Sequence, residues 1–358
     1  MIIIVPCAGK SKRYPNLRPK WMLTQPNGEM MVVESLKGLD IKPEDRIIIS
    51  ILEEHEEKYH IAEGLKKSFN RPIDVCILKE SLKSQPADVY QTIQQMNLNE
   101  NNPLLIKDSD NYFELMNLNE PESYVTISSL NNYSAINPRN KSYVKLDANN
   151  YITEIVEKKV ISDTFSIGGY YFKLIKEFIE GFKEMYLAKE GGEFYVSDVI
   201  GLLMSKGDKF KIKEGKNYLD WGTVEEWNKY KLSQKTFIID LDGVLVKSSA
   251  KYFQPYWGTS EGIAENIEAI NKLKENGNQI IILTSRTEEY RQITEEQLKN
   301  IGLKYDSLIM NALHNQRVVI NDFSSSNPFP SAMAINLERD SNRLAYFLKS
   351  MNFLKSLD

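Results

Sequence analysis

The sequence predicts an α/β protein with two domains, from its length, an alternation of strand and helix patterns, and a restart of that alternation late in the chain. At 358 residues the chain is long for a single hydrophobic core. Short β-branched runs alternate with longer amphipathic segments, which is typical of a mostly parallel sheet covered by helices. The strand patterns cover 2–5, 46–52, 73–78, 103–108 and 123–130, and helical patterns cover 28–39 and 86–96.

The alternation restarts after the polar stretch "LSQKT" at 232–236. A strand pattern in 237–246 is followed by a helix over 262–276, a strand over 279–285, a helix over 288–301 and a strand over 317–322. We therefore expect domains at 1–232 and 236–358. Ligands of parallel sheets gather at the carboxyl ends of the strands, so the residues that follow each strand are the candidates for function.

The composition of the chain argues against several classes of protein. A formal net charge of -4 speaks against nucleic acid as a partner, and no apolar run approaches the ~20 residues of a membrane span. Cys7 and Cys76 form neither a disulfide framework nor a metal-type spacing, and the opening "MIIIVPCAGK" lacks a basic leader. We expect a cytoplasmic protein without a membrane partner, and a homo-oligomer is left open.

The strongest chemical signal lies in "FIIDLDGVLV" at 237–246, where Asp240 and Asp242 follow an apolar strand. Alternation places both carboxylates on one side of the chain, where they invite a cation or a shared proton. The alternative is a solvated acidic turn. The two later strands also end in polar groups, namely Thr284 and Ser285, then Asn321 and Asp322. Their convergence at one sheet edge predicts a phosphate and Mg²⁺ site.

Over 236–358 this set resembles the haloacid dehalogenase superfamily of phosphatases. The resemblance implies that Asp240 is a nucleophile forming an aspartyl-phosphate and that Asp242 is a general acid and base. It further implies that Thr284 and Ser285 hold the phosphate and that Asp240, Asp242 and Asp322 hold Mg²⁺. The lysine usual before the last acidic motif is missing, so Arg317 is its expected substitute and Lys304 the alternative. The interval between Asp242 and Thr284 leaves no room for a large cap domain.

The chain opens with a strand that runs into "AGKSKR" and "RPKWML". A basic surface turn is the plain interpretation. The stretch also resembles the triphosphate loop of sugar-phosphate nucleotidyltransferases, with Ser11 and Lys12 where a glycine and a small hydroxyl residue are usual. The resemblance implies that Ala8, Gly9 and Lys10 bind the nucleotide, that Arg13 faces its phosphates, and that Lys20 lies beside the α-phosphate.

Four later stretches follow the order of the same family over 1–230. "KSQPADVYQTI" (83–93) implies that Gln85 reads the base, and "LLIKDSDNYF" (104–113) implies Asp110 as a metal ligand, with Asp108 as second choice. "YITEIVEKKVISDTFSIGGYYF" (151–172) and "YLDWGTVEEW" (218–227) complete the set. They imply that Glu157, Lys158 and Gly168 bind the sugar phosphate and that Asp220 is the second Mg²⁺ ligand.

The expected fold is thus a nucleotidyltransferase-type mixed α/β sheet domain followed by a capless haloacid dehalogenase-like Rossmannoid domain. The expected function is a bifunctional, Mg²⁺-dependent enzyme. It would transfer a nucleotidyl group from a nucleoside triphosphate, with a slight preference for CTP, to a sugar or polyol phosphate, and hydrolyse a phosphate monoester. Supply of capsular or other surface polysaccharide fits this pairing. Two rivals are a phosphatase with a degenerate amino-terminal binding domain and a nucleotidyltransferase with a non-catalytic assembly domain. A third, an RNA-end-processing enzyme, is disfavoured by the acidic balance.

Overall fold

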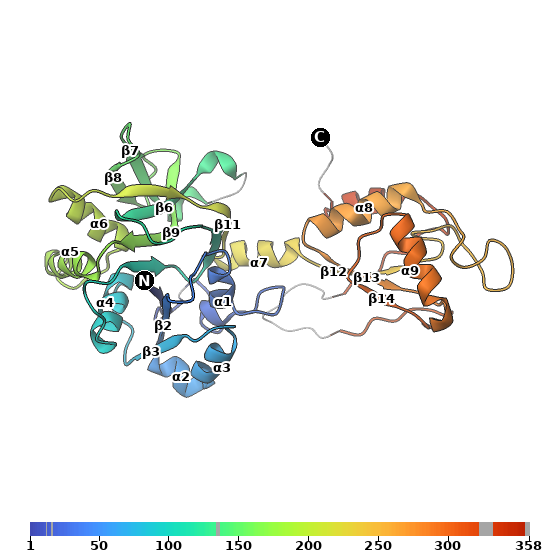
Figure 1. The fold of residues 1–358 in the computed structure, drawn as a ribbon, viewed down its shortest axis with the longest axis horizontal. Coiled ribbons are helices and arrows are strands. Elements are labelled where there is room, and N and C mark those ends of the chain that lie inside the picture. Colours follow the sequence, from blue (N-terminus) through green and yellow to red (C-terminus); the bar gives the residue numbers. More distant parts are fainter. Residues whose placement is uncertain (12, 16, 134–136, 322–331, 355–358) are drawn as a thin grey trace. The chain divides into compact units, whose positions relative to one another are not determined.

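The chain divides into two compact units, Met1–Trp227 and Asn228–Asp358. Figure 1 shows this computed structural model, which describes all residues except 12, 16, 134–136, 322–331 and 355–358. The prediction of a two-domain α/β fold is confirmed. Since the division between the units falls inside helix α7 (Val224–Ser233), the predicted limits at 232 and 236 stay a prediction.

The amino-terminal unit is built on a mixed sheet of nine strands within the described residues. Its main path runs β10-β6-β9-β4-β1-β2-β3; off this path, β7 pairs with β9, and β8 pairs with β7. These strands are β1 (Ile2–Pro6), β2 (Arg46–Leu52), β3 (Asp74–Leu78), β4 (Leu104–Lys107), β6 (Tyr124–Ser129), β7 (Ser142–Leu146), β8 (Ile152–Glu157), β9 (Thr164–Phe172) and β10 (Lys211–Glu214). β1 pairs in parallel with both β2 and β4, whereas β9 pairs antiparallel to β4 and β6.

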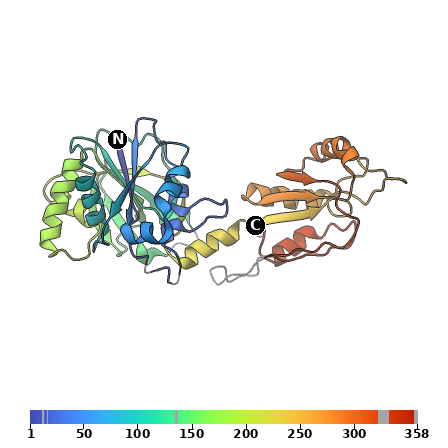
Figure 2. The same ribbon diagram turned by 90° about the horizontal axis from the view of Figure 1, so that it is seen from below.

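Both faces of this sheet are covered, as the apolar runs of its strands require. In β1, Ile2 and Ile4 belong to one buried cluster, while Ile3 and Val5 belong to the other. The helices of the unit before α7 are α1 (Met31–Leu36), α2 (Glu53–Tyr59), α3 (Ile61–Lys67), α4 (Gln85–Gln95), α5 (Ile175–Ala188) and α6 (Val196–Ser205). Within this unit, Figure 2 shows α4 and α5 on one side of the sheet and the blue helices of the first 70 residues on the other.

A separate two-stranded ribbon brings distant parts of the unit to the end of β4. β5 (Asn111–Glu114) pairs antiparallel with β11 (Lys216–Asp220), and Asp220 lies opposite Asn111. The backbone N–H of Trp221 also donates to the carbonyl of Asp110 at 2.9 Å. This pairing sets Asp220 beside the turn that follows β4.

The carboxyl-terminal unit has a parallel sheet in the order β12-β13-β14. Its strands are β12 (Thr236–Asp240), β13 (Gln279–Leu283) and β14 (Ser307–Ile309), and its helices are α8 (Ala264–Glu275), α9 (Arg291–Asn300) and α10 (Leu344–Ser350). Leu241, Leu245 and Ile282 are fully buried in its core.

The strand predicted over 317–322 is wrong for its described residues, because 317–321 are irregular and β14 is instead the third strand. Val318 and Ile320 are exposed. A β-branched run forms a strand only where a neighbouring ladder accepts its hydrogen bonds, and that is decided by tertiary structure. Asp322 lies outside the described residues. In the described part of the chain, no helix is long and apolar enough to cross a bilayer.

Candidate functional sites

A cavity of about 840 Å³ opens in the amino-terminal unit, where β1 and β4 end. It is lined by cations and acids together, as expected for a site that takes anions with a metal ion. The charged lining residues are Lys10, Arg13, Lys20, Lys83, Lys141 and Lys158, with Asp88, Asp108, Asp110, Glu157, Glu193, Asp220 and Glu226. Gly9, Gln85 and Gly168 also line it. Of the predicted amino-terminal site residues, Ala8 is the exception: it is fully buried in the core.

The loop after β1 takes a conformation that usually needs glycine. Ser11 has a φ of 47°, in the left-handed region that disfavours a Cβ. Its hydroxyl accepts a hydrogen bond from the backbone N–H of Lys20 at 3.0 Å, and its carbonyl accepts from Tyr14 at 2.8 Å. These two bonds hold Ser11 in place and fix the backbone at Lys20. Lys12 lies outside the described residues.

Asp110 and Asp220 face the same space. A Cβ built on Gly222 would lie 3.1 Å from Asp220 Oδ1 and 3.6 Å from Asp110 Oδ2. Lys20 forms an ion pair with Asp110, and Arg13 Nη2 lies 3.7 Å from the same carboxylate. Burial alone would raise the pKa of Asp110, but Lys20 and Arg13 hold it well below its usual range. Asp110 is therefore an anion surrounded by cations.

Asp220 has a lysine of its own. Lys141 forms an ion pair with Asp220, and its ammonium also donates to the Tyr218 hydroxyl at 2.7 Å. The backbone N–H of Gly222 donates to the other Asp220 oxygen at 3.0 Å. Sequence reasoning missed Lys141 and Tyr218, since nothing in "RNKSYVKL" marks that lysine out from its neighbours.

Asp108 also lines the cavity and is held from two sides. Gln85 Nε2 donates to Asp108 Oδ1 at 2.6 Å, and a Cβ on Gly168 would lie 2.4 Å from Asp108 Oδ2. The buried Lys107 ammonium fixes the turn further by donating to the carbonyls of Asp108 and Asn111 and to the Asn111 side chain. Burial raises the pKa of Asp108 and lowers the pKa of Lys107. These bonds hold the turn after β4 in place, and Asp110 is the carboxylate of this turn that pairs with Lys20 and Arg13.

Gly168→Ala should therefore damage the site. Gly168 has a φ of +84°, and the added methyl would clash with Asp108 and Asn111. We expect a loss of at least about 1 kcal/mol of unfolding free energy from the backbone alone, and a further loss of site activity because the turn carrying Asp110 must shift. Gly28→Ala is the matched control, because Gly28 has a φ of +88° and no atom within 4 Å of its built Cβ. Equal unfolding free energies and activities for the two variants would contradict this role of Gly168.

Asp88 is a buried acid in the wall of the cavity. One of its oxygens has no hydrogen-bond partner within the described structure, and burial raises its pKa to about 7. Its folded pKa exceeds its unfolded value, so the protonated form stabilises the fold at pH 4 and that contribution is lost as the pH rises through about 7.

Asp88→Asn should therefore raise the unfolding free energy at pH 8 by about 1–3 kcal/mol and change it little at pH 4. Denaturant unfolding at the two pH values measures this difference. The exposed Asp208→Asn is the control. A change of the same size at both pH values would exclude an ionisation effect.

Glu157 and Lys158 also line the cavity. Glu157 accepts hydrogen bonds from the hydroxyls of Ser142 and Ser197, the latter at 2.9 Å. Lys158 bonds to the hydroxyl of Tyr195 and lies 4.3 Å from the centre of its ring. The sequence analysis singled out neither Tyr195 nor Ser197.

In the carboxyl-terminal unit, Asp240 ends β12 and is exposed. The surrounding protein atoms nevertheless desolvate part of the Asp240 carboxyl group and raise its pKa, whereas the charges of Arg317 and His314 lower it. Arg317 Nη2 donates to the Ser285 hydroxyl at 3.2 Å. The structure thus brings Asp240, Ser285 and Arg317 to the same end of the sheet. Lys304, the alternative to Arg317, is paired instead with the exposed Glu275 at 2.8 Å.

Asp242 is engaged by a buried arginine. Arg286 donates to both of its oxygens at 2.9 and 2.8 Å, and Ser249 donates to one of them at 2.6 Å. Arg286 has no exposed surface and also donates to Gln297 at 2.8 Å. These bonds orient the Asp242 carboxylate, and its role as a metal ligand stays a prediction. Thr284 is buried, and its hydroxyl accepts a hydrogen bond from the backbone N–H of Arg286 at 3.2 Å. Sequence reasoning missed Arg286, although it directly follows Thr284 and Ser285.

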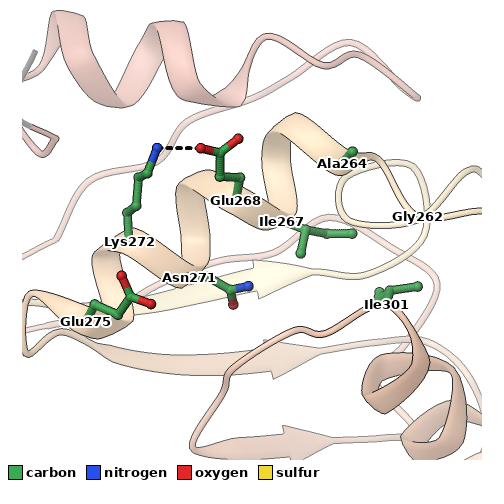
Figure 3. Close-up of a pocket in the computed structure, with 8 residues that line it drawn as sticks. All are labelled: Gly262, Ala264, Ile267, Glu268, Asn271, Lys272, Glu275 and Ile301. Carbon is green, nitrogen blue, oxygen red and sulfur yellow. Dashed lines mark hydrogen bonds and ion pairs between the residues drawn. The ribbon is translucent and has the colours of Figure 1, made fainter. Parts of the chain in front are cut away.

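A second cavity, of about 540 Å³, lies along α8 in the same unit (Figure 3). Its eight lining residues include Glu268 and Lys272, which pair with each other, and none of the predicted site residues. It is therefore not the predicted phosphate site.

Within the described residues, no three His, Cys, Asp or Glu side chains form a metal-binding group. Mg²⁺ is commonly held by one or two carboxylates, with waters and substrate phosphates completing its shell. Asp110 and Asp220 are such a hard-oxygen pair and fit this requirement. In the carboxyl-terminal unit Asp240 fits as one ligand, and the predicted partner Asp322 is not described.

Residues 233–322 match the family model for subfamily IIIB of the haloacid dehalogenase superfamily, described as acid phosphatase. The carboxyl-terminal unit contains a haloacid dehalogenase domain. Asp240, Asp242 and Arg286 lie in the matched segment of this haloacid dehalogenase domain, as do Arg317 and the undescribed Asp322.

Similar solved structures cover the amino-terminal part of the chain. One is a nucleoside-diphosphate-sugar pyrophosphorylase from Vibrio cholerae RC9, with a TM-score of 0.54 and 18% identity, over 65% of this chain and 100% of that one. The inositol-1-phosphate CTP transferase from T. maritima has a TM-score of 0.50 and 16% identity, over 64% of this chain and 94% of its own.

A putative glucose-1-phosphate thymidylyltransferase from Bacillus anthracis has a TM-score of 0.50 and 18% identity, over 65% of this chain and 94% of its own. Identities this low show the fold alone, so the part that precedes the haloacid dehalogenase domain has the sugar-phosphate nucleotidyltransferase fold. A comparison with curated protein sequences gave no match. Both similarities are to enzymes, as the sequence analysis expected.

Proposed function

We propose that the chain is a bifunctional, Mg²⁺-dependent enzyme with domains at 1–232 and 236–358. The first would transfer a nucleotidyl group from a nucleoside triphosphate to a sugar or polyol phosphate and release pyrophosphate. The second would hydrolyse a phosphate monoester. The observation that carries the proposal is the cavity in which Asp110 and Asp220 face one space beside Lys20, Arg13 and Lys141.

In nucleotidyl transfer, an oxygen of the acceptor phosphate attacks the α-phosphorus and pyrophosphate leaves in line. Arg13 and Lys20 would bind the triphosphate, and Lys158 the acceptor. Bound Mg²⁺, held by Asp110 and Asp220, would neutralise phosphate charge. No protein nucleophile is needed.

We further propose CTP as the nucleotide. The Gln85 amide N–H donates to Asp108, which leaves its carbonyl oxygen to accept from an exocyclic amine such as that of cytosine. Adenine also has such an amine, whereas uracil does not. The similar T. maritima protein, an inositol-1-phosphate CTP transferase, is named for CTP and a polyol phosphate, which supports the same choice.

In phosphate hydrolysis, the Asp240 carboxylate would attack phosphorus and release the alcohol, and water would then hydrolyse the aspartyl-phosphate. Ser285 and Arg317 would bind the phosphate oxygens, with Thr284 supporting the turn from behind. Asp242, oriented by Arg286, would give a proton to the leaving oxygen and later take one from water. Mg²⁺ at Asp240 and Asp322 would supply positive charge to the phosphate.

Pyrophosphate release from CTP, UTP, dTTP, ATP and GTP, each with a panel of sugar and polyol phosphates, tests the first activity. Phosphate release from the same panel tests the second. If no pair of nucleoside triphosphate and acceptor yields pyrophosphate while phosphate release is retained, the amino-terminal domain is a degenerate binding domain. The reverse result would favour a non-catalytic assembly domain. Two active domains would fit a cytoplasmic supply of activated sugar or polyol for surface polysaccharide, with small phosphorylated molecules rather than nucleic acid as partners.

A further inference from the structure

Each carboxylate proposed to hold Mg²⁺ in the cavity is paired with a lysine. Lys20 pairs with Asp110, and Lys141 pairs with Asp220. The Lys141 and Asp220 side chains are only 9% and 12% exposed, so solvent screens this pair weakly. Lys141 and both carboxylates line the same cavity. The Lys141 ammonium therefore occupies the electrostatic position of a metal cation.

A divalent cation and the ammonium cannot share the Asp220 oxygen at close range, because like charges repel. Lys141 must therefore leave when a cation binds there. A lysine has a flexible stem and three donors, so it can move while its backbone stays fixed. A released ammonium in a partly buried cavity needs a new anionic partner.

The backbone around Lys141 indicates which anion that is. The Lys141 carbonyl accepts a hydrogen bond from the Lys158 N–H at 2.8 Å, and the next residue, Ser142, bonds to Glu157. Lys141 thus belongs to the half of the cavity proposed for the acceptor. Lys20, by contrast, is attached to the loop after β1, through Ser11, in the nucleotide half.

We propose that Lys141 is a phosphate-binding residue that pairs with Asp220 until a divalent cation takes that carboxylate, and then binds the phosphate of the acceptor. This rests on the proposed nucleotidyl transfer. It makes acceptor binding depend on metal binding, because the ammonium becomes available only after the metal displaces it.

Binding of Mn²⁺ alone, followed by electron paramagnetic resonance, separates this role from a structural one. Lys141→Met should bind Mn²⁺ roughly tenfold more tightly than the wild type, because the competing ammonium is gone. A lysine that merely holds Asp220 in place predicts weaker binding. Lys145→Met is the matched control: Lys145 lies on β7, the strand that begins directly after Lys141, and pairs with the exposed Glu154 at 2.7 Å. Its Mn²⁺ affinity should equal that of the wild type.

Inorganic phosphate and CTP, titrated separately in the presence of Mg²⁺, then identify the anion. In Lys141→Met the phosphate affinity should fall at least about tenfold and the CTP affinity should stay unchanged, because one charge-assisted contact is lost. Lys141→Arg should retain phosphate binding. Circular dichroism verifies folding, and Lys141→Gln replaces the methionine variant if that variant unfolds.

Unchanged or weaker Mn²⁺ binding in a folded variant overturns the exchange, as does a wild type that binds no Mn²⁺. A loss of CTP affinity with unchanged phosphate affinity assigns Lys141 to the triphosphate and overturns the acceptor role. If no substrate pair yields pyrophosphate while both titrations behave as expected, nucleotidyl transfer fails and the exchange at Lys141 stands.

Discussion

Asp240→Asn should lower phosphate release at least about a thousandfold, because an amide cannot attack phosphorus as a carboxylate does. Asp240 is exposed at the end of β12, so the substitution should leave the fold intact. Pyrophosphate release by the same preparation should not change. Inorganic phosphate released from the best ester of the panel is the quantity to measure.

Glu261→Gln, an exposed change in the same unit, controls for loss of negative charge. Retention of more than a tenth of the phosphate release by Asp240→Asn would exclude Asp240 as the nucleophile. A parallel loss of pyrophosphate release would instead indicate that the protein had unfolded. Trapped phosphate on wild-type protein, absent from the variant, would provide direct evidence for the aspartyl-phosphate.

Asp110→Asn should lower pyrophosphate release at least about a hundredfold and leave phosphate release unchanged. The substitution removes a ligand charge for Mg²⁺ and leaves Lys20 and Arg13 without their carboxylate. Mn²⁺ affinity should fall together with the rate, which distinguishes loss of a metal ligand from loss of a substrate contact.

Asp108→Asn is the informative comparison, because Asp108 was the second choice from the sequence. Its carboxylate accepts from Gln85 and lies against Gly168, so its replacement should act mainly on nucleotide affinity. A larger loss of Mn²⁺ binding in Asp108→Asn than in Asp110→Asn would reverse the assignment of the metal ligand.

Much of the fold was predictable because it depends on local periodicity. The predicted strands at 46–52 and 73–78 appear as Arg46–Leu52 and Asp74–Leu78, and the helix at 86–96 appears as Gln85–Gln95. Apolar side chains that alternate or repeat along the chain determine which face is buried, and that pattern is readable without the fold. The strand predicted at 317–322 is wrong for its described residues, because a strand also needs a neighbouring strand to pair with, and local periodicity does not show whether one is present.

The candidate sites, like the fold, were predictable only in part. The stretches that end strands in acidic, basic and hydroxyl residues could be predicted, because the carboxyl ends of parallel strands are ligand positions whatever else the fold does. How those groups are paired depends on the tertiary structure. Lys141 pairs with Asp220, which is 79 residues away in the sequence, and Arg286 pairs with Asp242, which is 44 residues away. Such contacts follow from strand pairing and burial, which bring together side chains whose spacing in the sequence carries no periodic signal.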